Sequence, residues 1–373
     1  MTAPFGLNEI KEALTRIRGW IHRTPIITSH QLDTLAGRKL FFKTENLQKT
    51  GSFKVRGACN AVFLEKEKNP DGPGVVTHSS GNHGQAVAYA AKCAGLACSV
   101  VVPEGTPKVK CDAIQHYGAE LVFCQPSPAA RKETCERIAE ETGRAVIHPY
   151  DNYNVMAGQG TIALELLEEV PNLDAILVPI SGGGMTSGIA VAAHHMQPSC
   201  RVYAVEPFGK MLEQSLKSKQ RLWPNPPQFL NTIADAIRTQ QFVFSVFAVE
   251  PEGKELQRCL VSRKRLWSNP PKFLDTVADS IRIQQVGELT FPVLCQFAET
   301  QVFSITDDQM VEGMRLAMER TKMVVEAASG AAVYAGVRCL EDVEPKVERV
   351  GVILCGGNVD LDQLPWIHPS TSY

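Results

Sequence analysis

Residues 74–78 read GVVTH and residues 99–103 read SVVVP, and an alanine-rich helical pattern runs from Asn82 to Lys92 between them. Comparable apolar runs return between helix-period segments further along the chain, as ELVFC at 120–124, AILVP at 175–179, RVYAV at 201–205 and RVGVIL at 349–354. Runs rich in β-branched residues, without polar alternation, are typical of strands buried on both faces of a parallel sheet. The sequence therefore predicts an α/β fold.

Composition narrows the class of protein. The 373 residues suffice for two domains or one large α/β unit, and a formal net charge of −2 favours neither nucleic acid nor an anionic membrane as a partner. No apolar run is long enough to span a bilayer, and the first residues lack the pattern of a secretory signal. The eleven cysteines are scattered without CxxC pairs, which favours reduced thiols. We therefore expect a cytoplasmic protein.

One segment occurs twice. VYAVEP at 202–207 returns as VFAVEP at 246–251, and two further pairs keep the same offset of 44 residues: RLWPNPP at 221–227 with RLWSNPP at 265–271, and TIAD at 232–235 with TVAD at 276–279. We interpret residues 202–245 and 246–289 as a tandem duplication, either of joined alternative exons or of a genuine extra lobe. Because two copies are too few for a solenoid and a compact sheet rarely has room for both, only one copy is expected in the core position.

The stretch TGSFKVRG at 50–57 contains the first candidate catalytic group, Lys54. A lysine in a polar loop is usually a solvated surface residue. A lysine that forms a Schiff base must lie near a carbonyl and have a pKa lowered by partial desolvation. Phe53 can supply an apolar wall for that purpose, so the stretch suggests such a lysine without requiring it.

Two further polar clusters follow predicted strands. THSSGNHGQ at 77–85 opens a helix, where exposed backbone N–H groups favour an anion such as a substrate carboxylate. Here Ser79 or Ser80 could instead be a simple helix cap, and His83 a core histidine. PISGGGM at 179–185 also precedes a helix, and its glycines let the backbone approach a phosphate, although a plain tight turn has the same composition. It matches neither GxGxxG nor a P-loop.

Together these clusters resemble the fold-type II pyridoxal-phosphate enzymes, and within them the serine racemases and the serine/threonine dehydratases. The resemblance rests on KTGSFKVRG at 49–57, HSSGNHGQ at 78–85, AGQGT at 157–161, GGGM at 182–185, EP at 206–207 and CGGNVD at 355–360. It implies two open parallel-type sheets flanked by helices, as in the tryptophan synthase β chain. It also implies a large domain from residues 1–73 and 152–373, a small mobile domain from 74–151, and a homodimer.

The resemblance further implies a set of residues that hold pyridoxal 5'-phosphate. Lys54 would form the Schiff base, Phe53 would pack on the ring, and Asn82 would bond the phenolic oxygen. The backbone N–H groups of four residues would hold the phosphate: Gly182, Gly183, Gly184 and Met185. Glu326 would flank the ring, and Cys355 would be a neutral partner for the pyridine nitrogen, which favours elimination or proton return over a long-lived carbanion.

On the substrate side, the resemblance places one group of residues near the carboxylate, namely Ser79, Ser80, Asn82, His83 and Gln85, and places Arg131 near the substrate. Racemisation needs an acid/base on each face of the α-carbon, and Ser80 matches the second one in serine racemases, where dehydratases carry alanine. Residues 149–152, PYDN, look more like a dehydratase.

We therefore expect racemisation of L-serine to D-serine, accompanied by dehydration of L-serine or L-threonine to pyruvate or 2-oxobutanoate and ammonia. The alternatives are a dedicated serine, threonine or hydroxyaspartate dehydratase, an aspartate racemase, a β-replacing synthase, and an inactive pyridoxal-phosphate-binding homologue.

The chain departs from the family pattern at two effector sites. In serine racemases a divalent cation such as Mg²⁺ is held by the glutamate that matches Glu206 or Glu250, together with an aspartate six residues on, but Leu212 and Leu256 stand at those positions. The ATP site is matched only in part, because Lys49, Thr50 and Tyr117 agree with it while His30 replaces a serine. Both departures weaken the prediction of Mg²⁺ or ATP as an effector.

Overall fold

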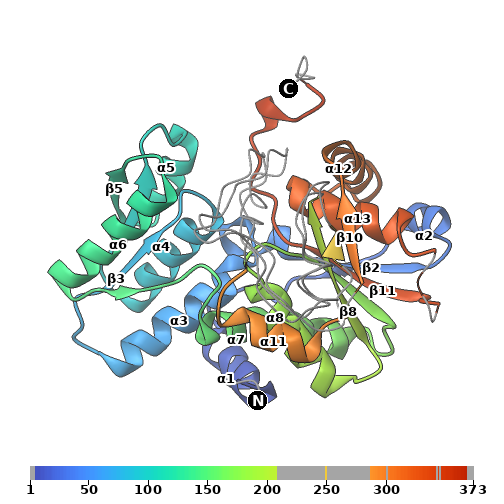
Figure 1. Cartoon of the computed structure of the whole chain (residues 1–373), viewed down its shortest axis with the longest axis horizontal. Coiled ribbons are helices and arrows are strands. Elements are labelled where there is room, and N and C mark those ends of the chain that lie inside the picture. The colour runs from blue at the N-terminus through green and yellow to red at the C-terminus, as the bar shows by residue number, and fades with distance from the viewer. Residues whose placement is uncertain are drawn as a thin grey trace.

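The computed structural model describes residues 5–207, 248–249, 286–299, 301–341, 343 and 346–367, and these residues build two separate sheets (Figure 1). Most of the second copy of the repeat and much of the first lie outside the described residues. The smaller sheet and its helices lie to the left in Figure 1, and the larger sheet lies to the right. The predicted α/β class is confirmed.

The larger sheet has seven strands in the order β1-β2-β11-β7-β8-β10-β9. Their bounds are Ile26–Ile27 (β1), Lys39–Thr44 (β2), Ala175–Pro179 (β7), Arg201–Pro207 (β8), Ala248–Val249 (β9), Val302–Ile305 (β10) and Arg349–Leu354 (β11). Apart from the antiparallel pair of β1 with β2, neighbouring strands of this sheet run parallel. The carboxyl ends of β2, β7 and β11 therefore meet at one edge, which is where ligands of open α/β sheets bind.

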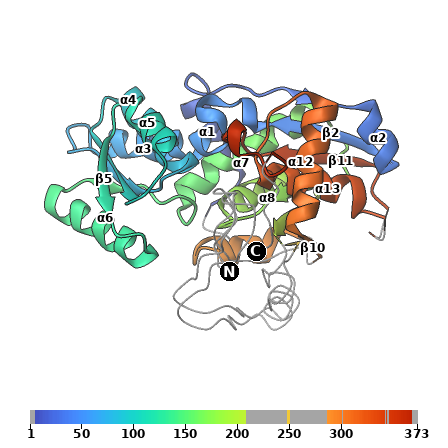
Figure 2. The same cartoon turned by 90° about the horizontal axis from the view of Figure 1, so that it is seen from above.

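The smaller sheet has four parallel strands in the order β5-β4-β3-β6. Their bounds are Val75–His78 (β3), Cys98–Pro103 (β4), Glu120–Cys124 (β5) and Ala145–Val146 (β6). The helices around it are Lys54–Lys68 (α3), Asn82–Ala94 (α4), Lys108–Gln115 (α5) and Pro128–Thr142 (α6). Figure 2 shows the compact group that these elements form beside the larger sheet.

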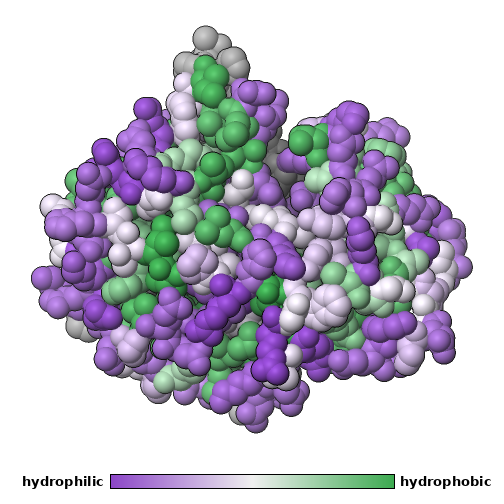
Figure 3. Space-filling model, turned by 180° about the vertical axis from the view of Figure 1, so that it is seen from behind, coloured by the Kyte–Doolittle hydropathy of each residue, from purple (hydrophilic) through white to green (hydrophobic). Residues whose placement is uncertain are grey.

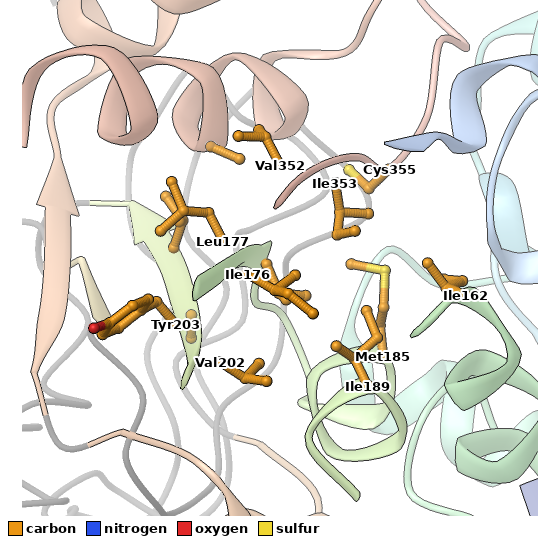
Figure 4. Packing of buried hydrophobic residues seen from close by; sticks show 14 of the residues in the cluster. Ile162, Ile176, Leu177, Met185, Ile189, Val202, Tyr203, Val352, Ile353 and Cys355 are labelled. Atoms are coloured by element: carbon orange, nitrogen blue, oxygen red, sulfur yellow. The ribbon is translucent and has the colours of Figure 1, made fainter. Parts of the chain in front are cut away.

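Helices cover both faces of the larger sheet. On one side lie His30–Ala36 (α2), Asp307–Thr321 (α12) and Ala327–Arg338 (α13), and on the other lie Leu7–Ile17 (α1), Tyr153–Glu169 (α7), Gly184–Met196 (α8) and Thr290–Phe297 (α11). Figure 4 shows side chains of β7, β8 and β11, such as Ile176, Val202 and Ile353, filling the space between the sheet and the helices. Burial on both faces explains why these strands lack polar alternation.

The two copies of the repeat contribute strands to the same neighbour. Strand β8, from the first copy, lies between β7 and β10, while β9, from the second copy, pairs with the other side of β10. Phe303 of β10 is in register with Val205 on one side and with Val249 on the other, and these two valines are equivalent in the repeat. Among the described strands, the first copy thus occupies the interior position, and the second copy's strand stands last in the order.

Polar residues cover most of the face shown in Figure 3, with apolar residues in patches between them and on the projection near the C-terminus. Within the described part of the chain, no helix combines the length and apolar character needed to cross a membrane.

Candidate active site

Lys54 is the first residue of α3, and the segment before it is tied to the end of β11. Ser52 forms a β-bridge with Gly356, and the N–H of Phe53 donates to the carbonyl oxygen of Cys355 over 3.1 Å. The side chain of Lys54 is 7% exposed, lies beside the Phe53 ring and donates from Nζ to the Pro149 carbonyl oxygen at 2.8 Å. Burial lowers the pKa of Lys54 to about 8, against the opposing influence of Cys355 and Glu326.

A hydrogen-bond network crosses the site between the two sheets. Asn82, the first residue of α4, donates from Nδ2 to Oε1 of the buried Glu326 at 2.7 Å. Asn358, which follows β11, donates from its side-chain amide to Asn82 Oδ1 at 2.7 Å and to the Thr50 carbonyl at 2.8 Å. Its backbone N–H also donates to Glu326 Oε1 at 3.2 Å. These bonds fix the orientation of the Asn82 amide, with its NH₂ group directed to Glu326.

Cys355 lies at the carboxyl end of β11, where its thiol is buried. Its Sγ is 3.4 Å from the Ser329 hydroxyl, which in turn donates to the Gly356 carbonyl at 3.2 Å. Burial raises the pKa of the Cys355 thiol, and the neighbouring Glu326 adds to this. The thiol is therefore neutral at physiological pH.

The loop between β3 and α4 carries Ser79 and Ser80, both half-buried. The alternative that one of them is the helix cap is wrong, because Gly81 is the N-cap of α4 and makes no side-chain cap bond. Ser79 Oγ accepts from the Gly81 N–H at 3.3 Å. The first backbone N–H groups of α4 have no partner within the helix and are suited to bind an anion.

His83 is buried in the first turn of α4, and its Nε2 lies 3.0 Å from the Ile147 carbonyl oxygen. Because a carbonyl only accepts, Nε2 carries the proton and Nδ1 is an acceptor; this Nδ1 is buried without a partner among the described residues. Burial lowers the pKa of His83 to about 3, and Lys54 contributes to the shift. The imidazole of His83 is thus neutral and cannot donate from Nδ1 to a carboxylate, so only its backbone N–H can do so.

Two further histidines lie close to His83. Burial lowers the pKa of His78 to about 4, with a contribution from Arg131, and it lowers the pKa of His148 as well. His148 Nδ1 accepts from the backbone N–H groups of Tyr150 and Asp151, so this residue also shapes the loop that carries Pro149. The histidine side chains beside the loop that carries Pro149 are therefore uncharged at neutral pH.

The glycine run lies between β7 and α8. Gly183 is the N-cap of α8 with φ of 84°, a conformation that favours glycine, and a Cβ on Gly182 would overlap the ring of Tyr150. Gly182 is also held through its carbonyl, which accepts from the Thr290 hydroxyl at 2.9 Å. The result is a backbone cradle at a helix N-terminus.

This cradle fits a phosphate. The hydroxyl of Thr186, in the first turn of α8, is fully buried and has no hydrogen-bond partner in the described part of the chain. A phosphate ester would supply the missing acceptor, and the helix dipole favours its charge. The hydroxyls of Thr50 and Ser52, on the segment that leads to Lys54, are likewise buried and unpartnered there.

Four predicted site residues remain, namely Gln85, Arg131, Glu206 and Glu250. Gln85 is half-buried on α4, and Arg131 belongs to α6, near His78. For Glu206 only the backbone is described, in β8, while Glu250 lies outside the described residues, as do Leu212 and Leu256. Among the residues that the structure describes, no group of three or more His, Cys, Asp or Glu side chains could hold a metal ion.

Comparison with known proteins leads to pyridoxal-phosphate enzymes, the class whose phosphate the glycine cradle fits. The profile of the pyridoxal-phosphate-dependent enzyme family matches residues 17–250 and 240–356. The serine racemase of Dictyostelium discoideum is 39% identical over 358 residues, covering 96% of this chain and 96% of that protein. The serine racemase of Mus musculus is 38% identical over 367 residues, covering 96% of this chain and 93% of that protein.

A solved structure leads to the same class. The crystal structure of a pyridoxal 5'-phosphate-dependent aspartate racemase shares 45% identity at a TM-score of 0.84, covering 98% of this chain and 99% of that one. The chain therefore belongs to the fold-type II pyridoxal-phosphate-dependent enzymes, in their racemase and dehydratase family. Its cofactor is pyridoxal 5'-phosphate.

Sequence reasoning missed several residues that build the site. Asn358 was within the quoted CGGNVD motif but received no role, and Tyr150 and Ser329 were not singled out. Asp151 was also missed: its carboxylate accepts from the backbone N–H groups of three residues at the start of α11, at 2.7, 2.8 and 3.1 Å. Tyr150 and Asp151 lie in the quoted PYDN stretch at 149–152, but the stretch shows no structural role for them because their partners are distant in sequence.

Proposed function

We propose that this enzyme racemises L-serine to D-serine and also dehydrates L-serine or L-threonine. When bound, pyridoxal phosphate withdraws electrons from the substrate and acidifies its α-C–H bond. The observation that carries the proposal is Lys54, an amine that is buried beside Phe53, hydrogen-bonded to Pro149 O and has a pKa lowered to about 8. Such an amine is available as a base near neutral pH.

The residues around Lys54 suit the three parts of the cofactor that must be held: its phosphate, its phenolic oxygen and its pyridine nitrogen. Gly182, Gly183, Gly184 and Met185, with the Thr186 hydroxyl, would hold the phosphate at the start of α8. Asn82 would bond the phenolic oxygen with the amide hydrogen that Glu326 does not use, and Cys355 would offer a neutral thiol to the pyridine nitrogen. A neutral partner there favours rapid return of the proton or loss of a leaving group.

Ser80 would decide between racemisation and dehydration of the substrate. Lys54 would take the α-proton on one face, and the Ser80 hydroxyl would return a proton on the other, giving the D-isomer. Where the β-hydroxyl leaves instead, the product hydrolyses to pyruvate and ammonia. The loop of Ser79 and Ser80 and the backbone of His83 would bind the carboxylate at the α4 N-terminus, with Gln85 nearby.

Aspartate racemase is a second candidate, and two observations favour it. A structure with that activity shares 45% identity with this chain. Arg131 also places a cation near His78 at the smaller sheet. The side-chain carboxylate of an aspartate substrate would be the group that pairs with this cation. If aspartate is the substrate, Arg131→Ala should raise the KM for aspartate far more than the KM for serine.

The experiment that tests the proposal incubates the purified, cofactor-loaded protein with L-serine, L-threonine and L-aspartate in turn. Chiral chromatography follows the D-isomers, and keto acids are assayed in the same samples. D-serine together with pyruvate supports the proposal, D-aspartate alone selects the second candidate, and keto acids alone indicate a dedicated dehydratase. Sulfide added with L-serine checks for a β-replacing synthase, and no product from any of these amino acids would point to an inactive homologue.

The organisation of the chain remains part of the proposal. We place the cofactor between a large domain of residues 1–73 and 152–373 and a small domain of 74–151, which is supported by the separate four-stranded sheet. We also propose that the enzyme is cytoplasmic and forms a homodimer. Sedimentation of the purified enzyme tests the dimer. Any activation by Mg²⁺ or ATP can be measured in the same serine assay.

A further inference from the structure

Arg56 lies two residues after Lys54, and the proposed reaction gives it no role. Its guanidinium is fully buried, and all five of its N–H groups are used. Two reach Glu45, from Nε at 2.7 Å and Nη2 at 2.8 Å, and two reach Glu165, from Nη1 at 2.7 Å and Nη2 at 2.8 Å. The fifth, on Nη1, points to the Thr161 hydroxyl at 3.1 Å.

A second buried cation completes the group. Lys43 is fully buried and donates from Nζ to Glu165 Oε2 at 2.7 Å and to the Thr24 carbonyl at 2.6 Å. The Thr24 hydroxyl donates to Glu45 Oε1 at 2.6 Å. Lys43, Glu45, Arg56 and Glu165 are called the buried charge cluster below; its two cations balance its two carboxylates.

The cluster joins the helix of the catalytic lysine to α7. Next to Arg56, the N–H of Gly57 donates to Gln159 Oε1 at 3.2 Å, and a Cβ on Gly158 would lie 2.6 Å from the Arg56 carbonyl oxygen. The first turn of α3 therefore touches α7 backbone to backbone. The carbonyl that accepts from Lys54 Nζ belongs to Pro149, on the loop that leads into α7.

Stability alone does not explain such a cluster. Removing four charges from water costs several kcal/mol per ion, and apolar side chains of similar volume are often as stable or more so. A fully paired, bidentate cluster differs from an apolar contact because it admits one arrangement of its members. It can therefore set the register of α3 on α7 more narrowly than apolar packing does.

We propose that Arg56 is a positioning residue: through the buried charge cluster it fixes the first turn of α3 on α7, and thereby the place of Lys54 Nζ in the active site. This inference rests on the proposed role of Lys54. It predicts that a small change at Arg56 disturbs the lysine more than it disturbs the fold.

Arg56→Lys tests this, because it keeps the charge but loses the planar fork. Three readouts are needed: thermal unfolding, steady-state kinetics, and the pH midpoint for labelling Lys54 in the apoprotein with a small aldehyde and borohydride, located by peptide mass spectrometry. We expect kcat to fall at least about 10-fold with KM changed less than about 3-fold, since misplacement of a reacting group is costly. The labelling midpoint should move from that of the wild type.

Two controls separate positioning from general destabilisation. Arg349→Lys changes an arginine on β11 whose guanidinium donates to the loop carbonyls of Pro171 and Asn172 and lies over the Phe41 ring. Leu40→Ala removes a buried core side chain of β2. Both should keep the wild-type labelling midpoint, even where Leu40→Ala lowers the melting temperature. If Arg56→Lys lowers the melting temperature but leaves the midpoint and kcat at wild-type values, the proposal is overturned.

Two further outcomes are decisive. If Arg56→Lys does not fold, Thr161→Val, which removes one acceptor from Nη1, carries the test, and an unchanged midpoint there refutes the positioning role. If the wild type converts none of the amino acids tested but the midpoint still shifts in Arg56→Lys, the positioning role stands and the proposed function fails.

Discussion

The burial of Lys54 sets the pH range in which this residue can act as a base. A lysine abstracts a proton only when its amine is neutral, which requires a pH above its pKa, and burial lowers that pKa to about 8. We therefore expect kcat to rise by about tenfold for each pH unit as the pH increases toward 7, and to level off above about pH 8. A rate that keeps rising through pH 10 would contradict this, because it would mean an ordinary lysine pKa.

Asn358 gives a second prediction at this scale. Its amide bridges Asn82 and the Thr50 carbonyl, so Asn358→Ala frees the Asn82 amide to turn away from the cofactor. We expect the affinity for pyridoxal phosphate to fall by about 10-fold, in line with the loss of one or two hydrogen bonds. Titration of the visible absorbance of bound cofactor measures it. Asn8→Ala, at an exposed position of α1, serves as the control; equal affinities for both variants would remove Asn358 from the site.

Individual residues were predictable where a local motif carries them. Lys54, Phe53 and the glycines of 182–184 stand in short motifs that single them out as candidates, while their roles came from the resemblance and not from each motif alone. The orientation of Asn82 and the tautomer of His83 could not be predicted, because they depend on Asn358 and Ile147, which are remote in sequence. The predicted place of His83 near a substrate carboxylate stays a prediction, to which the structure adds that its Nε2 is already directed to the Ile147 carbonyl.

At the scale of elements, the start of α11 depends on Asp151. Three backbone N–H groups of that helix start donate to its carboxylate, and Thr290 then holds the Gly182 carbonyl. Asp151→Ala should lower the free energy of unfolding by about 1–3 kcal/mol, as the loss of a buried cap does. Urea denaturation measures this. Asp151→Asn keeps one oxygen acceptor and should lose less; equal losses would mean that the carboxylate does not act as a cap.

Most strands were predicted within a residue or two, since apolar runs such as 175–179 and 349–354 coincide with β7 and β11. Four strands were not singled out: β1, β2, β6 and β10. In β2 the fully buried Lys43 makes the stretch look partly solvated, although its charge is paired inside the molecule. Paired burial of a charge cannot be recognised from one segment alone.

For the whole molecule, the repeat leads to a deletion test. Removing residues 208–251 joins Pro207 to Glu252 and leaves a single copy of the 44-residue unit. If the repeat is a duplication, this shorter chain should fold, bind pyridoxal phosphate and melt within about 5 °C of the full chain. Calorimetry and visible absorbance check this. An insoluble chain, or one that binds no cofactor, would indicate that both copies are needed.

The overall class followed from the sequence because buried parallel strands and their crossover helices have a regular pattern. The arrangement of the repeat did not follow, because both copies have nearly the same strand sequence and pair with opposite sides of β10. Because the two copies of the repeat share one sequence pattern, the sequence alone does not show which copy forms the interior strand.

The most direct test of the central claim compares the wild type with Ser80→Ala on L-serine, measuring D-serine and pyruvate in the same samples. If Lys54 and Ser80 act on opposite faces of the α-carbon, D-serine formation falls by about 100-fold or more, while pyruvate formation stays within about 3-fold. If D-serine formation is retained, or if both products fall together, Ser80 is not the second acid/base and the two-face account is wrong.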